Sequence, residues 1–97
     1  NKMLLVCDEL LFQITYNNKI LRLRPKEYDL LKILIENSHR ILSKSQLIDI
    51  VWPHLSKNSR VVDTNVSRLR SKLKILGHPG IYVSSKRGYR LITEKPE

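Results

Sequence analysis

Residues 60–73 have the sequence Arg-Val-Val-Asp-Thr-Asn-Val-Ser-Arg-Leu-Arg-Ser-Lys-Leu, and they carry the strongest periodic pattern in the chain. Apolar residues recur at intervals of four, three and four, at Val62, Val66, Leu69 and Leu73. This spacing places the four side chains on one side of an α-helix, which predicts a helix that packs against a core through that stripe. We expect Ser59 to cap the helix and the helix to end before Gly77.

The face of this helix opposite the apolar stripe is polar and basic. A helical wheel assigns to it Thr64, Asn65, Arg68, Ser71 and Lys72. In the major groove of duplex DNA, Arg can bind guanine and Asn can bind adenine through two hydrogen bonds, and the Thr methyl can contact thymine. Most amphipathic helices also have a solvated polar face, so the helix alone does not establish a contact with nucleic acid.

A hairpin with a basic tip is expected C-terminal to this helix. Two β-prone runs, 81–84 and 89–92, are joined by Ser85-Lys86-Arg87-Gly88. A tip that carries Lys86 and Arg87 is suited to reach a phosphate backbone or a minor groove beside a helix in the major groove. Helix and hairpin together therefore predict a protein that contacts two grooves of a duplex.

Two shorter helices are expected N-terminal to residue 60. Pro25 is suited to a first helical position and precedes an apolar periodicity, which predicts a helix over 25–37. Arg24 stands in its cap position and forgoes a side-chain cap worth about 1 kcal/mol. Ser43-Lys44-Ser45-Gln46 fits a capping box, so a second helix is predicted over 44–52 and is ended by Pro53. Residues 53–58 are expected to form a polar loop.

The first 24 residues are predicted to form a small antiparallel sheet. Apolar runs at residues 3–6, 10–14 and 20–23 predict three short strands, and Asn17-Asn18 is suited to a hairpin turn because Asn tolerates positive φ. A chain of 97 residues is long enough for one core. We therefore expect a single domain over residues 1–97, with a sheet in 1–24, a three-helix core in 25–76 and a hairpin in 80–92.

The charge of the chain is strongly positive and unevenly distributed. The formal net charge is +9, and the segment 57–90 holds nine basic residues against one acidic residue, Asp63. This asymmetry indicates that the basic face binds a polyanionic partner, such as nucleic acid or an acidic membrane surface. The alternative is a basic face that only keeps the domain soluble, and the asymmetry makes it the less favoured interpretation. A basic RNA-binding or ribosome-associated module is the alternative, although the sequence lacks the paired aromatic residues on a strand that are typical of such modules.

No enzyme, metal site or cofactor is predicted. Cys7 is the only cysteine, so an internal disulfide is excluded, and no Cys/His group has metal-ligand spacing. Three histidines have no Ser, Cys or carboxylate at a catalytic spacing and are expected in loops or at the surface: His39, His54 and His78. No apolar run approaches the roughly 18 residues of a membrane-spanning helix. We therefore expect a cytoplasmic domain.

Three segments, 42–52, 60–73 and 86–91, resemble the OmpR/PhoB winged-helix family in sequence, order and spacing. The first has the sequence Leu-Ser-Lys-Ser-Gln-Leu-Ile-Asp-Ile-Val-Trp and the last Lys-Arg-Gly-Tyr-Arg-Leu. The resemblance implies an α+β fold, a winged helix-turn-helix with a leading four-stranded antiparallel sheet, three helices and a C-terminal β-hairpin wing. It implies sequence-specific binding of double-stranded promoter DNA by a bacterial transcription regulator, with helix 60–74 in the major groove and wing 84–90 at the adjacent minor groove.

The same resemblance assigns contact and core positions. The family's DNA-contact positions fall on Arg60, Thr64, Asn65, Ser67, Arg68 and Arg70 of the helix and on Ser85 and Arg87 near the wing tip. Lys72 and Lys86 join the expected DNA-binding set on the arguments from helix face and hairpin tip. Trp52 and Tyr89 fall on core and wing-base positions, and Tyr28 and Trp52 also lie in apolar stripes, so we expect core side chains there.

The resemblance also bears on partners and on the full-length protein. RNA polymerase, through loop 53–58, and a second copy of the domain, in a homodimer or in tandem on DNA, are the further partners expected. Lys86-Arg87-Gly88-Tyr89 resembles the ToxR/CadC branch, whose members carry this domain at the N-terminus of a membrane-anchored one-component regulator. Response regulators of the family carry it after a phosphoacceptor receiver domain, and the sequence leaves both arrangements open.

Overall fold

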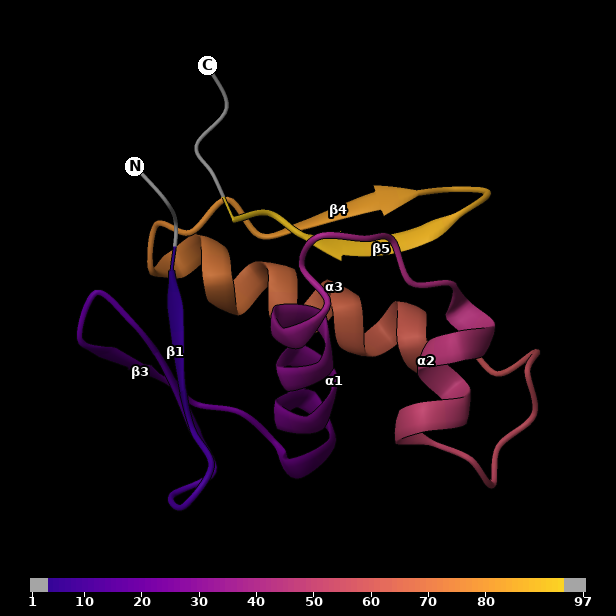
Figure 1. Ribbon diagram of the computed structural model, residues 1–97, viewed down its shortest axis with the longest axis horizontal. Helices are drawn as coiled ribbons and strands as arrows, with labels where there is room; N and C mark the ends of the chain where they lie inside the picture. Colours follow the sequence, from indigo (N-terminus) through magenta and orange to yellow (C-terminus); the bar gives the residue numbers. More distant parts are fainter. Residues whose placement is uncertain (1–3, 94–97) are drawn as a thin grey trace.

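The computed structural model describes residues 4–93 and places three helices between a small sheet and a C-terminal hairpin (Figure 1). The strands are β1 (Leu5–Asp8), β2 (Gln13–Tyr16), β3 (Lys19–Leu21), β4 (Ile81–Ser84) and β5 (Gly88–Leu91). The helices are α1 (Pro25–Glu36), α2 (Lys44–Val51) and α3 (Val61–Ile75). This order of elements confirms the predicted α+β architecture. None of the described helices is long and apolar enough to cross a membrane.

The leading sheet is antiparallel with the strand order β1-β2-β3. Within residues 4–93 it therefore has three strands, as the apolar runs predict, and not the four that the family resemblance implies. Asn17 and Asn18 form the turn between β2 and β3 with φ of 52° and 65°, which confirms the predicted hairpin. Both residues lie in the left-handed region that a two-residue turn of this kind requires.

The first two strands lie further along the chain than the apolar runs predict. Residues 10–12 form a turn, and their side chains are exposed, with Leu10 at 92%. The Oδ1 of Asp8 accepts the backbone N–H groups of Leu10 and Leu11 at 3.0 and 3.1 Å, and this Asx-type turn ends β1 at Asp8. The prediction of a strand over 10–14 is therefore wrong in its first half. Met3 lies outside the described residues.

The ends of the first two helices follow their capping residues. The Oγ of Ser43 accepts the N–H of Gln46, and the Gln46 side chain accepts the N–H of Ser43, so the predicted capping box of α2 is confirmed. Arg24 makes no side-chain cap at α1, because its guanidinium has no acceptor. The Oε1 of Glu27 nevertheless accepts the Arg24 N–H at 2.9 Å, which satisfies one donor at this end.

The third helix begins one residue later than predicted. Arg60, not Ser59, holds the cap position, and its side chain makes no capping hydrogen bond. Ser59 still contributes, because its Oγ accepts the N–H of Val61 at 3.2 Å. The predicted stripe is confirmed in full, since its four residues are at most 3% exposed and pack with α1 and α2: Val62, Val66, Leu69 and Leu73. Tyr28 and Trp52 are core residues as expected.

The hairpin is attached to the helical core at the start of β5. Tyr89 exchanges two backbone hydrogen bonds with Leu42, the residue before the capping box of α2, at 2.8 and 2.9 Å. Gly88 precedes this pair with φ of 131°, and a Cβ on it would lie 2.0 Å from the Leu42 carbonyl oxygen. Only glycine therefore allows the wing backbone to approach the α2 segment so closely.

Replacing Gly88 with Ala should destabilise the fold on the order of 2–4 kcal/mol, because the methyl group meets backbone atoms and the φ is unfavourable for a side chain. Urea unfolding followed by circular dichroism measures this loss. Gly80→Ala is the matched control, since Gly80 also has a positive φ, of 95°, but a Cβ there meets nothing within 4 Å. The control should lose about 1 kcal/mol. Equal losses in the two variants would contradict the steric role of Gly88.

Candidate nucleic-acid interface

One side of α3 is exposed along the whole helix and carries polar and basic groups. It begins at the cap residue and consists of Arg60, Thr64, Ser67, Arg68 and Ser71, all of which are exposed. Their spacing of four, three, one and three residues keeps them on the side opposite the buried stripe. The structure therefore brings together most of the helix positions that the sequence analysis selected, on one continuous surface.

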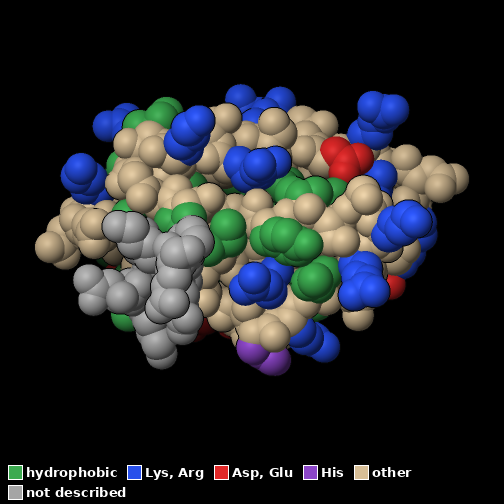
Figure 2. Space-filling model, turned by 90° about the horizontal axis from the view of Figure 1, so that it is seen from above, with side chains coloured by type: hydrophobic (Ala, Val, Ile, Leu, Met, Phe, Trp, Pro, Cys, Tyr) green, Lys and Arg blue, Asp and Glu red, His purple; other side chains and the backbone are tan. Residues whose placement is uncertain are grey.

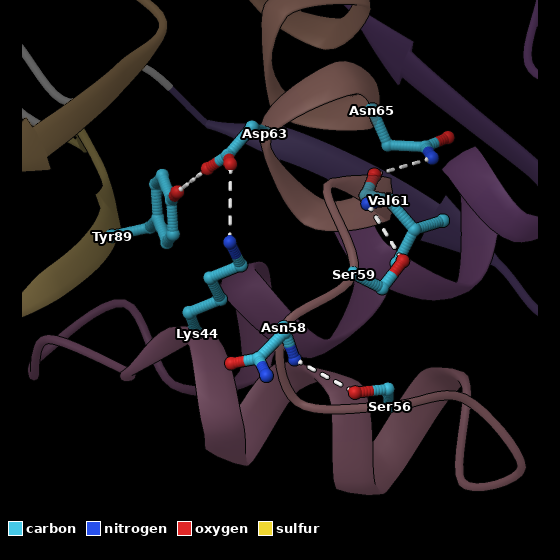
Figure 3. Close-up of polar contacts among 8 residues, drawn as sticks. All are labelled: Lys44, Ser56, Asn58, Ser59, Val61, Asp63, Asn65 and Tyr89. Atoms are coloured by element: carbon cyan, nitrogen blue, oxygen red, sulfur yellow. Dashed lines mark hydrogen bonds and ion pairs between the residues drawn. The ribbon is translucent and has the colours of Figure 1, made fainter.

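Asn65 does not share this exposed face. It is 7% exposed, and its Nδ2 donates to the carbonyl oxygen of Val61 at 2.8 Å (Figure 3). The helical-wheel assignment of Asn65 to the outer face is therefore wrong. Asn65 lies three residues after Val62 and four before Leu69, and this spacing places it at the margin of the buried stripe.

Lys72 lies between α3 and α1 and is not a free surface cation. Its Nζ donates at 2.5 Å to Oε1 of Glu27, which is fully buried in the first turn of α1. Burial raises the pKa of Glu27, but the hydrogen bonds from Lys72 and the Arg24 backbone outweigh it and hold this pKa below its ordinary value. The expectation that Lys72 stands on the exposed face is thus corrected, because its charge compensates a buried carboxylate.

A second basic surface follows the flank of α3 toward its C-terminal end. Ser67, Arg70, Ser71 and Lys74 line a groove of about 520 Å³ that the loop residues His78 and Pro79 complete. Arg70 and Lys74 are exposed and lie one helical turn apart. Sequence reasoning missed Lys74, although its position seven residues after Ser67 already placed it beside the selected face.

The three residues of the wing tip, Ser85, Lys86 and Arg87, are all exposed. They border a groove of about 500 Å³ whose other side is formed by residues 43–45 at the start of α2 and by Asp63 of α3. The structure therefore brings the predicted wing residues and the first turn of α3 to one groove. Figure 2, which looks down on the wing side of the molecule, shows many Lys and Arg side chains and few acidic ones.

A polar cluster joins the base of the wing to α3 and α2 (Figure 3). The Tyr89 hydroxyl donates to Oδ1 of Asp63 at 2.5 Å, and Lys44 Nζ lies 3.2 Å from Oδ2 of the same carboxylate. The bond from Tyr89 and the ion pair with Lys44 hold the pKa of Asp63 below its ordinary value despite partial burial. Burial and the bond to Asp63 raise the pKa of Tyr89 to about 12. Sequence reasoning missed this cluster.

The basic residues of this surface form no ion pair with a carboxylate in the described part of the chain. Within residues 4–93, five lysines form ion pairs: Lys26, Lys32, Lys44, Lys57 and Lys72. Across the same part of the chain, no ion pair involves the exposed cations of α3, its cap and the wing tip, which are Arg60, Arg68, Arg70, Lys74, Lys86 and Arg87. Their charges are available to an external anion.

The histidines do not assemble into a site with other ligands. His39 and His54 are exposed, as expected. His78 lies in a loop, as expected, and is buried, at 3% exposed; its Nδ1 accepts the Gly80 N–H at 2.8 Å and its ring packs edge-on against Tyr16. Among the described residues, no group of three His, Cys, Asp or Glu side chains could hold a metal ion.

Comparisons with known proteins agree with this geometry. Residues 17–91 match the family described as "Transcriptional regulatory protein, C terminal". Over 71 residues the chain is 38% identical to the response regulator ArlR of Staphylococcus epidermidis, an alignment that covers 72% of this chain and 32% of ArlR. Over 83 residues it is 36% identical to the transcriptional activator CadC of Escherichia coli, covering 82% of this chain and 16% of CadC. The chain thus spans about a third or less of these relatives.

Solved structures show the same fold. The DNA-binding domain of Escherichia coli CadC superposes with a TM-score of 0.77 at 32% identity, covering 93% of this chain and 87% of that domain. The DNA-binding domain of the response regulator AdeR, solved in complex with an intercistronic region, superposes with a TM-score of 0.79 at 24% identity, covering 93% and 94%. The second likeness supports the fold alone.

Replacing Lys72 with Met should destabilise the domain by roughly 2–4 kcal/mol near neutral pH, because the buried Glu27 carboxylate then loses its ionic partner. Since the folded-state pKa of Glu27 is lowered, its stabilising contribution is present above the unfolded-state pKa and is lost as pH falls through the folded-state value. The difference between the wild type and the variant should therefore shrink below pH 4.5, the ordinary value for this group. Urea unfolding at neutral and acidic pH measures it.

The control for this prediction is the double variant Glu27→Gln/Lys72→Met, which removes both charges and should recover part of the lost stability at neutral pH. A destabilisation by Lys72→Met that stays constant over the whole acid range would contradict the role of the ion pair.

Proposed function

Because the chain belongs to the family of transcriptional regulatory proteins matched over residues 17–91, we propose that it is the sequence-specific, double-stranded-DNA-binding domain of a bacterial transcription regulator. The observation that carries the proposal is the exposed, unpaired basic surface shared by α3 and the wing tip. An α-helix fits the major groove, and a narrow hairpin beside it can reach the adjacent minor groove. The family is one of regulators, and no catalytic activity is proposed.

The exposed face of α3 supplies the groups that would contact base edges. Arg68 is exposed at the middle of the helix, where it can donate two hydrogen bonds to guanine, and Thr64 lies one turn earlier on the same face. Arg60 and Ser67 complete this part of the proposed contact set. Asn65 is 7% exposed and one of its two amide N–H groups donates to the Val61 carbonyl, so we propose a supporting role for it and no base contact.

Phosphate contacts are proposed for the flanks of the helix and for the wing. Arg70 and Lys74 are exposed beside the proposed base-contacting face, in the groove near His78. Within residues 4–93 neither forms an ion pair with an Asp or Glu side chain. Ser85, Lys86 and Arg87 form the second contact at the wing tip. Contacts of this kind set the register of a protein on DNA, and base contacts then select the sequence.

The remaining partners belong to the full-length protein. We propose that two copies bind neighbouring half-sites, as a homodimer or in tandem, and that loop 53–58 contacts RNA polymerase. All residues of this loop except Leu55 are exposed, which leaves it accessible beside the DNA-binding surface. The wing sequence Lys86-Arg87-Gly88-Tyr89 and the likeness to CadC support a cytoplasmic domain in a parent protein anchored in the inner membrane.

Arg68→Ala should weaken binding to the specific site by 1–3 kcal/mol, on the order expected for a base-edge contact, and should relax selectivity at one position. Lys74→Ala should weaken specific and random duplexes alike and reduce the slope of log K against log salt by about 0.9. Binding-site selection from random DNA identifies the site, and fluorescence anisotropy over a salt series measures both effects. Equal losses by Arg68→Ala on specific and random duplexes would contradict its base-contact role.

The double variant Lys86→Ala/Arg87→Ala should weaken binding most where an A·T-rich flank narrows the minor groove, because that narrowing deepens the negative potential felt by an inserted Arg. Both side chains are exposed, so folding should be unchanged. The measurement compares two duplexes that differ only in an A-tract or a G·C flank. Equal losses on both would indicate generic phosphate contact, and no loss on either would remove the wing from the interface.

A further inference from the structure

The wing of this domain is held at its base and open at its tip. β4 and β5 pair with each other as a two-stranded sheet, and the groove of about 500 Å³ beside residues 84–87 separates the tip from the helices. The backbone bonds between Tyr89 and Leu42 attach the hairpin at a single residue pair. Ile81 and Leu91 also pack in the hydrophobic core and hold the base of the hairpin, whereas the tip residues 85–87 are exposed. A side-chain contact from the hairpin to the helices therefore adds a further constraint on the direction of the tip.

The Tyr89 hydroxyl supplies such a contact at a distance from the backbone pair. It donates to Asp63 at 2.5 Å (Figure 3). Asp63 lies in the first turn of α3, between the exposed Arg60 and Thr64. The second oxygen of Asp63 is held by Lys44 from the first turn of α2. One carboxylate therefore connects the wing, the start of α3 and the start of α2.

We infer that Tyr89 and Asp63 are positioning residues that fix the wing relative to α3, so that the wing-tip contact and the helix contact with DNA are energetically coupled. The inference rests on the proposed function. A ligand that must first order a mobile segment binds more weakly than one that meets a segment already in place. With the bond present, Lys86 and Arg87 are held beside the DNA that α3 engages; without it, binding must align them.

A double-mutant cycle on DNA affinity tests the inference. It combines Tyr89→Phe, which removes only the hydroxyl, with Lys86→Ala/Arg87→Ala, and each protein is titrated against the selected duplex. Tyr89→Phe should weaken binding about threefold to tenfold in the wild type, the range of one hydrogen bond. In the protein that lacks the wing-tip cations, Tyr89→Phe should change DNA affinity less than about twofold, because the contact between the wing tip and DNA is already removed.

Two further comparisons separate positioning from general stability. Tyr82→Phe is the matched control, since Tyr82 lies on β4, is 46% exposed and forms no hydrogen bond to Asp63. It should leave DNA affinity unchanged. Asp63→Asn keeps an oxygen that accepts the Tyr89 hydroxyl and should retain most of the coupling, whereas Asp63→Ala should abolish it. The same cycle run on these two variants decides the question if Tyr89→Phe unfolds.

The outcomes are distinguishable from failure of the proposed function. A wild-type domain that shows no preference for any duplex would overturn the function itself. A wild-type domain that binds selectively, together with equal losses from Tyr89→Phe in both backgrounds, would overturn only the positioning role. Equal losses would mean that the hydroxyl acts on the helix or on DNA directly, independently of the wing tip.

Discussion

The burial of one stripe of α3 fixes the rotation of this helix, and the assignment of its functional face depends on that rotation. Val62, Val66, Leu69 and Leu73 are at most 3% exposed against α1 and α2. At roughly 1.5–3 kcal/mol for each buried aliphatic side chain, no surface contact of the helix competes with this term. The opposite face is therefore held toward solvent without any ligand, and side chains at the margin of the stripe are drawn into the domain.

Local patterns in the sequence predict the helices and their ends well. The capping box at Ser43, the proline at Pro25 and the paired asparagines at 17–18 act within a few residues, so their effects are visible without a tertiary structure. The strand assignment of residues 10–14 failed because an apolar run does not reveal which of its members are buried. Asp8 closes a turn there and leaves three large apolar side chains in solvent.

The candidate site was predicted only in part, because some of its contacts join residues that are far apart in the sequence. The exposed helix face and the wing tip follow from periodicity and charge, which the sequence displays directly. The bonds between Lys72 and Glu27 and between Tyr89 and Asp63 join residues 45 and 26 positions apart, and no local pattern pairs them. A helical wheel also divides α3 into a buried face and an exposed face. Asn65 and Lys72 lie at the boundary between these faces, where packing against neighbouring helices decides whether a side chain is exposed.

Carboxylates near a DNA-binding surface are expected to repel phosphate, yet Asp63 lies in the first turn of α3 beside Arg60. Both of its oxygens are engaged, one by the Tyr89 hydroxyl and one by the Lys44 ammonium. The pair with Lys44 cancels most of the field that a free carboxylate would present to an approaching phosphate. The helix thus keeps the favourable interaction of an acidic residue with its N-terminal dipole while the surrounding cations dominate the outer surface. The one acidic residue of segment 57–90 therefore serves the internal geometry of the domain with little loss of positive potential on the proposed DNA-binding surface.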